Sequence, residues 1–596
     1  MNTGNGRFPK GRIAWLWENM EGRHLLYIAA ITGTVVYNIM QLTVPYFSQK
    51  IVDTFLSGED AAYNLTYRKD YLIHLLVLMV SLTIARVVIV YLDCMAYEHV
   101  SQEALFRIRN ILYDKIQRQD MHFYNIYRTG DLMTRVTGDL DAVRHMIAWV
   151  IRVIIESVSL IAATMTFFFY MNWRLALLLM ITAPFIFVII RLFRKRVAPM
   201  HASLREKFAG MNTVAQENIA GNRVVKAFAM EEREKERFDE CNTDYRDTNK
   251  KTALTWLTFF PYMEGIADLL SVILILAGGL SLILWPDLMT MGEYVAFSGL
   301  IWALANPMRM LGNVMNEFQR FSAASAKVME IYYSEPEIKD REGAYDAVDR
   351  LKGEIVFDNV SFKYADGKLP VLKNISMKIR SGETVAIMGE TGCGKTSLIH
   401  LIPRFYEPTE GDIRIDGRSV KDYTLKSLRT NIGLATQDVL LYSDTIDGNI
   451  AYGDMDLTRK EVERYARYSA ASSFISRMPD GYDTVVGERG VGLSGGQKQR
   501  ISLARALAVK PAILILDDTT SAVDMETEKQ IQHSLRELDF ECTKIIIAQR
   551  ISTTKSVDRI FIMKDGQIAE EGTHEELIAK NGYYAELVRL QTGEAV

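Results

Sequence analysis

The chain has 596 residues, of which 49% are hydrophobic and 24% charged, and its formal net charge is −4. This length is enough for several domains, and the near-neutral charge balance gives no indication of nucleic-acid binding. The scattered cysteines, Cys94, Cys241, Cys393 and Cys542, show the spacing of neither a zinc site nor a disulfide framework. Basic residues at the N-terminus precede no short apolar core with a cleavage pattern, so no removable signal peptide is predicted.

The first half contains apolar stretches long enough to cross a bilayer, which takes about 20 helical residues. We predict six spans, near residues 25–47, 71–95, 146–172, 175–193, 257–285 and 291–318. Two long polar segments rich in arginine and lysine separate the second span from the third and the fourth from the fifth. Because basic residues accumulate on the cytoplasmic side, these segments, the N-terminus and the C-terminal half are predicted to be cytoplasmic. Buried core helices of a soluble protein would not be confined to one half of the chain.

A few ionisable residues interrupt the predicted spans. They are Arg86, Asp93, Arg152, Glu156, Glu264, Asp268 and Arg309. A charged group is costly in hydrocarbon, so each should face the bundle interior or an aqueous cavity. Arg152 and Glu156 are four residues apart on one helix face, which leaves open whether they pair with each other or contact a substrate. The sequence assigns no role to any of them.

The pattern changes after the sixth span. We predict a transmembrane domain at 1–320, a charged linker at 321–350 and a second domain at 351–596. In the second domain short β-branched strands alternate with turns and helices, which is typical of an α/β fold.

A glycine-rich loop in this domain carries the clearest chemical signal. It follows the strand-like segment 384–388 and opens onto the helix-like segment 397–401, the setting of a P-loop. Backbone N–H groups and the helix N-terminus would hold phosphates there, with the lysine on the outer phosphates and the threonine on Mg²⁺. The predicted binding residues are Gly389, Thr391, Gly392, Cys393, Gly394, Lys395, Thr396 and Ser397. The expected fold class is thus an all-α six-helix transmembrane domain followed by an α/β P-loop NTPase domain.

Two further motifs accompany the P-loop. The apolar run 513–516 predicts a strand buried on both faces, and it ends in Asp517 and Asp518, where Mg²⁺ and an attacking water would lie. The other motif precedes a helix-like stretch, so its amides predict a second anion-binding site; it consists of Ser494, Gly495, Gly496 and Gln497.

This ordered set of motifs resembles that of the ATP-binding cassette (ABC) exporters, in particular half-transporters with one membrane domain fused to one nucleotide-binding domain. The resemblance extends from the first span to about residue 577. It implies that Tyr364 stacks on adenine and that Gln437 links Mg²⁺ to the membrane domain. It also implies that Asp517 supports the metal, alongside Thr396 and Gln437, and that Asp524 signals across a dimer.

The resemblance further implies a partner chain, because the signature motif at 494–497 closes the nucleotide site of a facing domain. Residues 487–490 resemble the exporter-type X-loop, and 123–135 and 217–228 resemble the two coupling-helix regions. A chain with one nucleotide-binding domain therefore needs a second half-transporter, together with ATP and Mg²⁺.

Two residues depart from the family pattern. ABC ATPases usually have glutamate directly after the aspartate that ends this strand, but here the residue is Asp518, which is one methylene shorter. They usually have histidine at the switch position after the next strand, but here it is Gln549, which cannot take up a proton. Both changes fall in the same site, which predicts that this chain's own site binds ATP but hydrolyses it poorly. The alternative is that both are tolerated variants of an active homodimer.

The sequence therefore predicts a subunit of a heterodimeric ATP-driven exporter that moves hydrophobic or amphipathic molecules, drugs or lipids, out across a bacterial plasma membrane. The catalytic residues proposed are Asp518, Gln549, Gln437 and Asp524. The alternatives are a homodimeric lipid or drug flippase, and a channel or sensor that the cassette regulates without pumping. Nothing in the sequence identifies the substrate.

Overall fold

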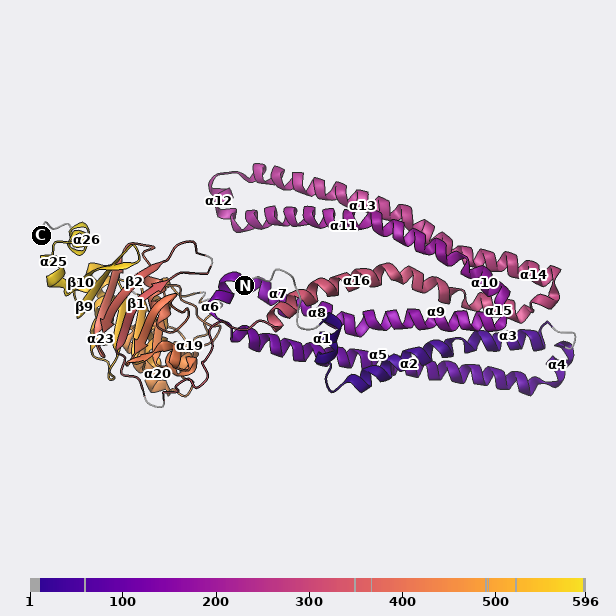
Figure 1. Ribbon diagram of the computed structural model, residues 1–596, viewed down its shortest axis with the longest axis horizontal. Coiled ribbons are helices and arrows are strands. Elements are labelled where there is room, and N and C mark those ends of the chain that lie inside the picture. Colours follow the sequence, from indigo (N-terminus) through magenta and orange to yellow (C-terminus); the bar gives the residue numbers. More distant parts are fainter. Residues whose placement is uncertain are drawn as a thin grey trace. The chain divides into compact units, whose positions relative to one another are not determined.

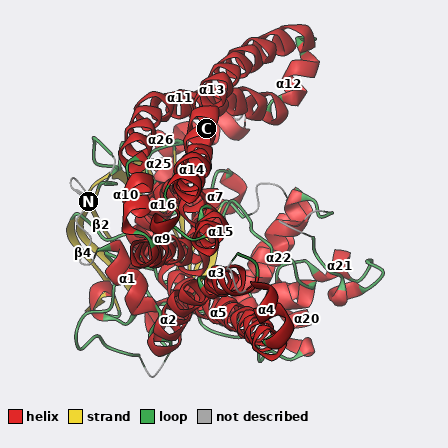
Figure 2. Cartoon of the chain, turned by 90° about the vertical axis from the view of Figure 1, so that its right-hand side faces the viewer, coloured by secondary structure: helices red, strands yellow, loops and turns green. Residues whose placement is uncertain are grey.

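The computed structural model describes residues 11–57, 61–347, 350–365, 367–487, 490, 492–519 and 523–592. The chain divides into two compact units, one formed by Met1–Gln117 with Gly130–Ser334 and the other by Arg118–Thr129 with Glu335–Val596. The strands, yellow in Figure 2, all belong to the second unit in the described part of the chain.

Long helices build the first unit (Figure 1). They are α1 (Arg12–Asn19), α2 (His24–Gln41), α3 (Thr43–Phe55), α4 (Ala61–Tyr67), α5 (Lys69–Gln117), α7 (Thr129–Val136), α8 (Gly138–His145), α9 (Ile151–Met171), α10 (Trp173–Met180), α11 (Thr182–Ala220), α12 (Asn222–Ala227), α13 (Glu231–Ile273), α14 (Gly279–Leu284), α15 (Met291–Leu300) and α16 (Trp302–Tyr332). Two π-helical turns, η1 (Met146–Val150) and η2 (Leu274–Gly278), interrupt these helices.

Three helical stretches among the described residues are long and apolar enough to cross a membrane: His24–Phe55, Lys69–Gln117 and Thr129–Met171. They cover the first three predicted spans. The other three predicted spans fall on α10 with α11, on α13 with α14, and on α15 with α16. Some side chains of these helices, including Glu264 and Arg309, lie outside the described residues. A helical transmembrane domain is therefore present, whereas the count of six spans is not confirmed.

The second unit contains two sheets. The four-stranded sheet has the order β2-β1-β4-β5 and the six-stranded sheet the order β10-β9-β3-β8-β7-β6. The strands are β1 (Ile355–Phe362), β2 (Leu372–Ile379), β3 (Thr384–Gly389), β4 (Glu410–Ile415), β5 (Arg418–Ser419), β6 (Ile432–Ala435), β7 (Ile513–Asp517), β8 (Thr543–Ile547), β9 (Arg559–Lys564) and β10 (Gln567–Gly572).

The second unit also contains helices. They are α6 (Met121–Ile126), α17 (Lys395–Leu401), α18 (Leu425–Thr430), α19 (Ile446–Ile450), α20 (Arg459–Tyr468), α21 (Ser472–Ile475), α22 (Gly495–Ala508), α23 (Met525–Arg536), α24 (Ile551–Thr554), α25 (His574–Ala579) and α26 (Tyr583–Thr592). The strands β3, β8, β7 and β6 are parallel neighbours, so their carboxyl ends meet at one edge of the sheet. The loops that follow these strands contain most of the predicted site residues.

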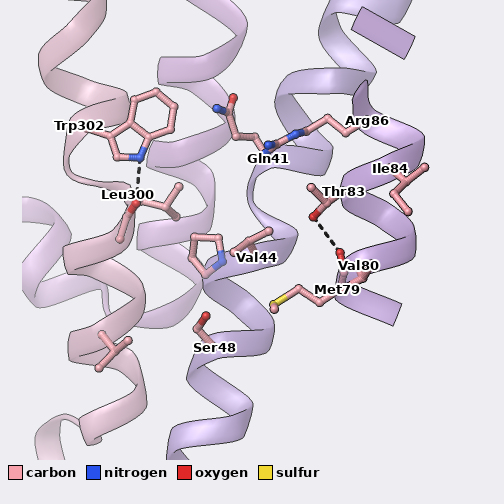
Figure 3. Close-up of a pocket in the computed structure, with 13 residues that line it drawn as sticks. Gln41, Val44, Ser48, Met79, Val80, Thr83, Ile84, Arg86, Leu300 and Trp302 are labelled. Atoms are coloured by element: carbon pink, nitrogen blue, oxygen red, sulfur yellow. Dashed lines mark hydrogen bonds between the residues drawn. The ribbon is translucent and has the colours of Figure 1, made fainter. Parts of the chain in front are cut away.

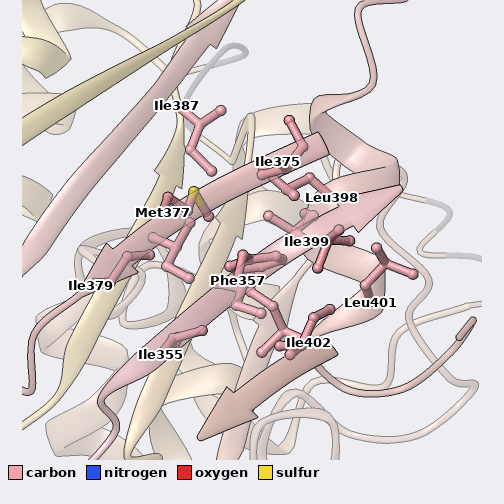
Figure 4. Close-up of a cluster of buried hydrophobic side chains, with 14 of the residues drawn as sticks. Ile355, Phe357, Ile375, Met377, Ile379, Ile387, Leu398, Ile399, Leu401 and Ile402 are labelled. Carbon is pink, nitrogen blue, oxygen red and sulfur yellow. The ribbon is translucent and has the colours of Figure 1, made fainter. Parts of the chain in front are cut away.

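A buried apolar cluster holds the first helix after the P-loop in place (Figure 4). Leu398 and Ile399 of α17 are fully buried with Phe357 of β1 and Ile375 of β2. Fully burying one such side chain stabilises a fold by roughly 1.5–3 kcal/mol. The cluster therefore positions the N-terminus of α17, which ends the phosphate loop, against both sheets.

Candidate nucleotide-binding site

The predicted phosphate loop connects β3 to α17, in the strand–loop–helix arrangement that the sequence indicated. Gly394, the residue before α17, has φ +102°, a value that L side chains rarely adopt. A Cβ atom on Gly389 would lie 2.2 Å from the carbonyl oxygen of Met563, so only glycine fits at this point. The Lys395 ammonium donates to the carbonyl oxygens of Gly389 and Glu390, both at 2.8 Å, which places it at the loop where phosphates would bind.

The predicted metal ligands Thr396 and Asp517 lie together. The Thr396 hydroxyl donates to Asp517 Oδ2 at 3.2 Å, and Asp517 is only 4% exposed at the end of β7. Burial raises the pKa of Asp517, while the Thr396 hydroxyl opposes that shift. A hydroxyl and a carboxylate at the phosphate loop supply the hard oxygen ligands that Mg²⁺ prefers, so this pair fits the cation. Gln437 lies exposed, two residues beyond the end of β6.

The two residues that depart from the family pattern contact each other. Gln549 Nε2 donates to Asp518 Oδ2 at 2.9 Å. The contact forms because β7 and β8 are adjacent parallel strands and Asp518 and Gln549 follow their ends. Asp518 has φ +49°, a left-handed conformation that aspartate tolerates better than most residues. A cavity of about 290 Å³ adjoins both side chains.

Tyr364, the predicted adenine-stacking residue, contacts the phosphate-loop helix. Its hydroxyl lies 2.9 Å from the hydroxyl of Ser397, which is itself a predicted nucleotide ligand. The ring also packs edge-on against Tyr406, with the ring centroids 5.1 Å apart. A phosphate bound at Ser397 would compete with the tyrosine hydroxyl, so nucleotide entry and the position of this ring are linked.

The predicted signature motif forms the start of α22. Ser494 is the N-cap: its hydroxyl accepts from the Gln497 N–H, and Gln497 Oε1 accepts from the Ser494 N–H at 2.8 Å. This capping box leaves the N–H groups of Gly495 and Gly496 at the positive end of the helix dipole. The Gln497 side chain thus hydrogen-bonds within its own helix, whereas the sequence predicted that it binds nucleotide.

Asp524 caps another helix. Its carboxylate accepts from the backbone N–H of Thr527 at 2.9 Å and from the Thr527 hydroxyl at 2.8 Å. These hydrogen bonds hold the pKa of Asp524 below its usual range. The neighbouring residues 521–522, and residues 488–489 of the predicted X-loop, lie outside the described residues.

Two residues at this site carried no sequence signal. Glu528, which is 2% exposed on α23, accepts from the Arg550 guanidinium at 3.0 Å and from the Thr553 hydroxyl at 2.6 Å. Gln591, near the end of α26, forms hydrogen bonds with the backbone on both sides of Arg550. Neither residue belongs to a recognisable motif. Each forms its hydrogen bonds with a loop that is far away in the sequence, so no local pattern marks it.

A second candidate site lies within the first unit, where a cavity of about 570 Å³ opens between α3, α5, α15 and α16 (Figure 3). Its lining is mostly apolar, with Gln41, Ser48, Thr83 and Arg86 as polar groups. The Arg86 guanidinium lies 5.9 Å from the ring centre of Tyr37. An apolar cavity with a few polar groups suits a molecule with both characters.

Arg152, another arginine of the predicted spans, has partners within the chain. Arg152 Nε lies 3.9 Å from Glu156 Oε2, and Arg152 Nη1 donates to Cys94 Sγ at 3.0 Å. The structure therefore contains the ion pair that the four-residue spacing allowed.

Comparison with known families matches both units. Residues 27–308 match the ABC transporter transmembrane region, and residues 372–521 match the ABC transporter family. An uncharacterized ABC transporter ATP-binding protein of Bacillus subtilis, YknU, is 40% identical over 489 residues, which are 82% of this chain and 83% of that protein. A protein of Chromohalobacter salexigens named ATP-dependent lipid A-core flippase is 34% identical over 572 residues, 96% of each chain.

A solved structure shows the same architecture. A bacterial Atm1-family ABC exporter with ATP bound superimposes with a TM-score of 0.80 at 28% identity, covering 96% of this chain and 99% of that one. The chain therefore belongs to the ABC transporter family, as an exporter half-transporter in which a helical transmembrane domain is fused to one ABC ATPase domain.

Proposed function

We propose that this chain is one half of an ATP-driven exporter that moves amphipathic or hydrophobic molecules, lipids or drugs, out across a bacterial plasma membrane. Relatives that cover up to 96% of the chain are named lipid A-core flippases, which supports a lipid-like substrate. The apolar cavity with Arg86 and Gln41 provides a matching environment in the membrane unit. In this proposal the N-terminus and the nucleotide-binding domain are cytoplasmic.

We further propose that the nucleotide site built on this chain's own P-loop holds ATP and hydrolyses it slowly. The observation that carries this proposal is the 2.9 Å hydrogen bond from Gln549 to Asp518. It directs the short carboxylate toward an amide that neither accepts a proton nor becomes cationic. A displacement of about 1 Å at a positioned catalytic group costs on the order of 10²-fold in rate. Binding groups are retained in Tyr364, Lys395 and Thr396, so ATP–Mg²⁺ would remain bound.

The partner would then be a second half-transporter with a competent site, to which this chain contributes its signature helix α22. Ser494, Gly495 and Gly496 would contact the nucleotide bound on the partner, and Asp524 would lie at the dimer contact. A homodimeric flippase is the competing assembly; a relative that matches 96% of the chain is named a lipid A-core flippase.

Expression of the chain alone and together with a candidate partner distinguishes the two assemblies. ATP turnover is measured in proteoliposomes after purification through a tag on this chain only. We expect little turnover from this chain alone and family-level turnover from the pair. Brisk turnover by the chain alone refutes the impaired site and favours the homodimer. Substrate accumulation against a gradient in the same vesicles excludes a channel or sensor.

A further inference from the structure

The last helix of the chain reaches the loop that follows β8. Gln591 Nε2 donates to the carbonyl oxygen of Gln549 at 2.9 Å, and Gln591 Oε1 accepts from the Ile551 N–H at 3.0 Å. The two bonded residues flank Arg550. A single side-chain amide on α26 therefore holds the backbone both before and after this residue, and we call residues 549–551 the switch loop.

The side chains of the switch loop have partners on other elements. Gln549 Nε2 donates to Asp518 Oδ2 at 2.9 Å, and Arg550 Nη1 lies 3.0 Å from Glu528 Oε2. The side chains of Gln549 and Arg550 are thus held by the loop after β7 and by α23, while Gln591 holds the backbone of the switch loop. Together these contacts determine where the Gln549 amide group lies.

The same helix is attached to the phosphate loop at its other end. The Tyr583 hydroxyl donates to Glu390 Oε1 at 3.0 Å, and Glu390 lies in the P-loop. The next residue, Tyr584, is fully buried, and its hydroxyl lies 2.9 Å from that of Thr554. The ten residues of α26 form nearly three helical turns, each of which rises about 5.4 Å. The helix is thus long enough to connect the phosphate loop with the switch loop, and a triphosphate would bind between these two loops.

We propose that Gln591 is a positioning residue of the nucleotide site: it fixes the distance of the Gln549 amide from the phosphate loop and so sets the contact with the terminal phosphate of ATP. The inference rests on the proposed role of Gln549 as the switch residue. The effect should fall on the γ-phosphate, because the amide of Gln549 is the group proposed to contact it, whereas Tyr364 is proposed to hold the base and the backbone N–H groups of the P-loop the inner phosphates. Gln591 is exposed, so its replacement removes two hydrogen bonds without opening a cavity in the core.

The test compares ATP with ADP in the assembled transporter. Gln591→Met keeps the side-chain length and removes both bonds. The assembled transporter is photolabelled with 8-azido-ATP or 8-azido-ADP in the presence of Mg²⁺, at a temperature without turnover. The labelled chain is identified by its mass, and the labelling of this chain is measured against nucleotide concentration. We expect the affinity for ATP to fall about 5-fold, because losing a hydrogen bond costs about 1 kcal/mol net. The affinity for ADP should stay unchanged.

Two further variants sharpen the comparison. Gln591→Glu keeps an acceptor for the Ile551 N–H but loses the donor to the Gln549 carbonyl, so its effect should be intermediate. Gln567→Met is the matched control, since it makes the same substitution at another exposed glutamine of the same unit. Equal losses of ATP and ADP affinity in Gln591→Met, or no loss of either, refute the proposal.

A double-mutant cycle separates positioning from general support of the helix. In a Gln549→Ala background, Gln591→Met should cause no additional change in the ratio of ATP to ADP affinity, because the positioned group is gone. Additive effects refute the inference while leaving the role of Gln549 intact. If Gln549→Ala alone leaves the ATP preference unchanged, the proposed switch role fails first and this inference fails with it.

Discussion

Replacing Asp518 by glutamate together with Gln549 by histidine tests whether the contact between these two residues limits hydrolysis. In the structure the Gln549 amide holds the Asp518 carboxylate at 2.9 Å. Glutamate extends the carboxylate by about 1.5 Å, the length of one carbon–carbon bond. Histidine removes the amide donor and provides a group that can become cationic beside the leaving phosphate.

The expected gain follows from these distances. A correction of more than 1 Å at the water-positioning group should raise hydrolysis at this site on the order of 10²-fold, which corresponds to about 2.7 kcal/mol in activation free energy. Asp518→Glu alone should give much less, because the Gln549 amide still engages the carboxylate, and the two changes should therefore be non-additive. Asp518 has φ +49°, so glutamate there costs about 1 kcal/mol of stability.

The assay is trapped-nucleotide analysis of the assembled transporter during steady-state turnover, with ATP and ADP on this chain separated after quenching. The native site should contain mainly ATP and the double variant mainly ADP. Asp456→Glu, the same exchange at an exposed loop residue, is the control and should change neither. If the native site already holds mostly ADP, or if the double variant changes neither occupancy nor turnover, the reasoning about this contact is wrong.

Three further outcomes are expected from the described contacts. Burial raises the pKa of Asp517, so folding favours its protonated form. The contribution of Asp517 to the free energy of unfolding is therefore present at acid pH and is lost as pH rises through the raised folded-state pKa. Asp517→Asn should accordingly raise the thermal midpoint of nucleotide-free protein at neutral pH and abolish its further rise with ATP–Mg²⁺, and an unchanged midpoint in both conditions would contradict this. Glu528→Gln breaks an ion pair in which the carboxylate is buried and the arginine is partly exposed, and it should lower the free energy of unfolding by about 2 kcal/mol, measured by urea denaturation. A change below about 0.5 kcal/mol, the usual range for surface substitutions, would show that the pair contributes little. Gly496→Asp, at the start of α22, should reduce turnover of the assembled pair far more than Asp518→Asn does, whereas the reverse order would mean that the two nucleotide sites are assigned the wrong way round.

The local motifs of the nucleotide-binding domain could be predicted from the sequence because each is contiguous. The P-loop from Gly389 to Ser397 occupies one strand–loop–helix unit, and a backbone turn of this kind depends on its own glycines. The buried strand that ends in Asp517 was predicted from its continuous apolar run for the same reason. Both are short-range properties of the chain, and the structure contains both elements where they were expected.

The membrane half was less completely determined by hydropathy. The apolar stretches identified a helical transmembrane domain, but only three helical stretches among the described residues meet the length and hydropathy expected of a span. Hydropathy also does not show which residues group together in space. Residues Arg118–Thr129 lie between two helices of the first unit in sequence, yet they pack with the second unit.

The contacts that define the candidate site were decided by the tertiary structure. Asp518 and Gln549 were each recognised as unusual, but their hydrogen bond exists only because β7 and β8 are parallel neighbours. Glu528 and Gln591 had no local signal at all, since their partners are 22 and 42 residues away in the chain. A sequence motif records which groups are available along the chain, whereas the pairing of strands and the docking of α26 determine which of those groups meet.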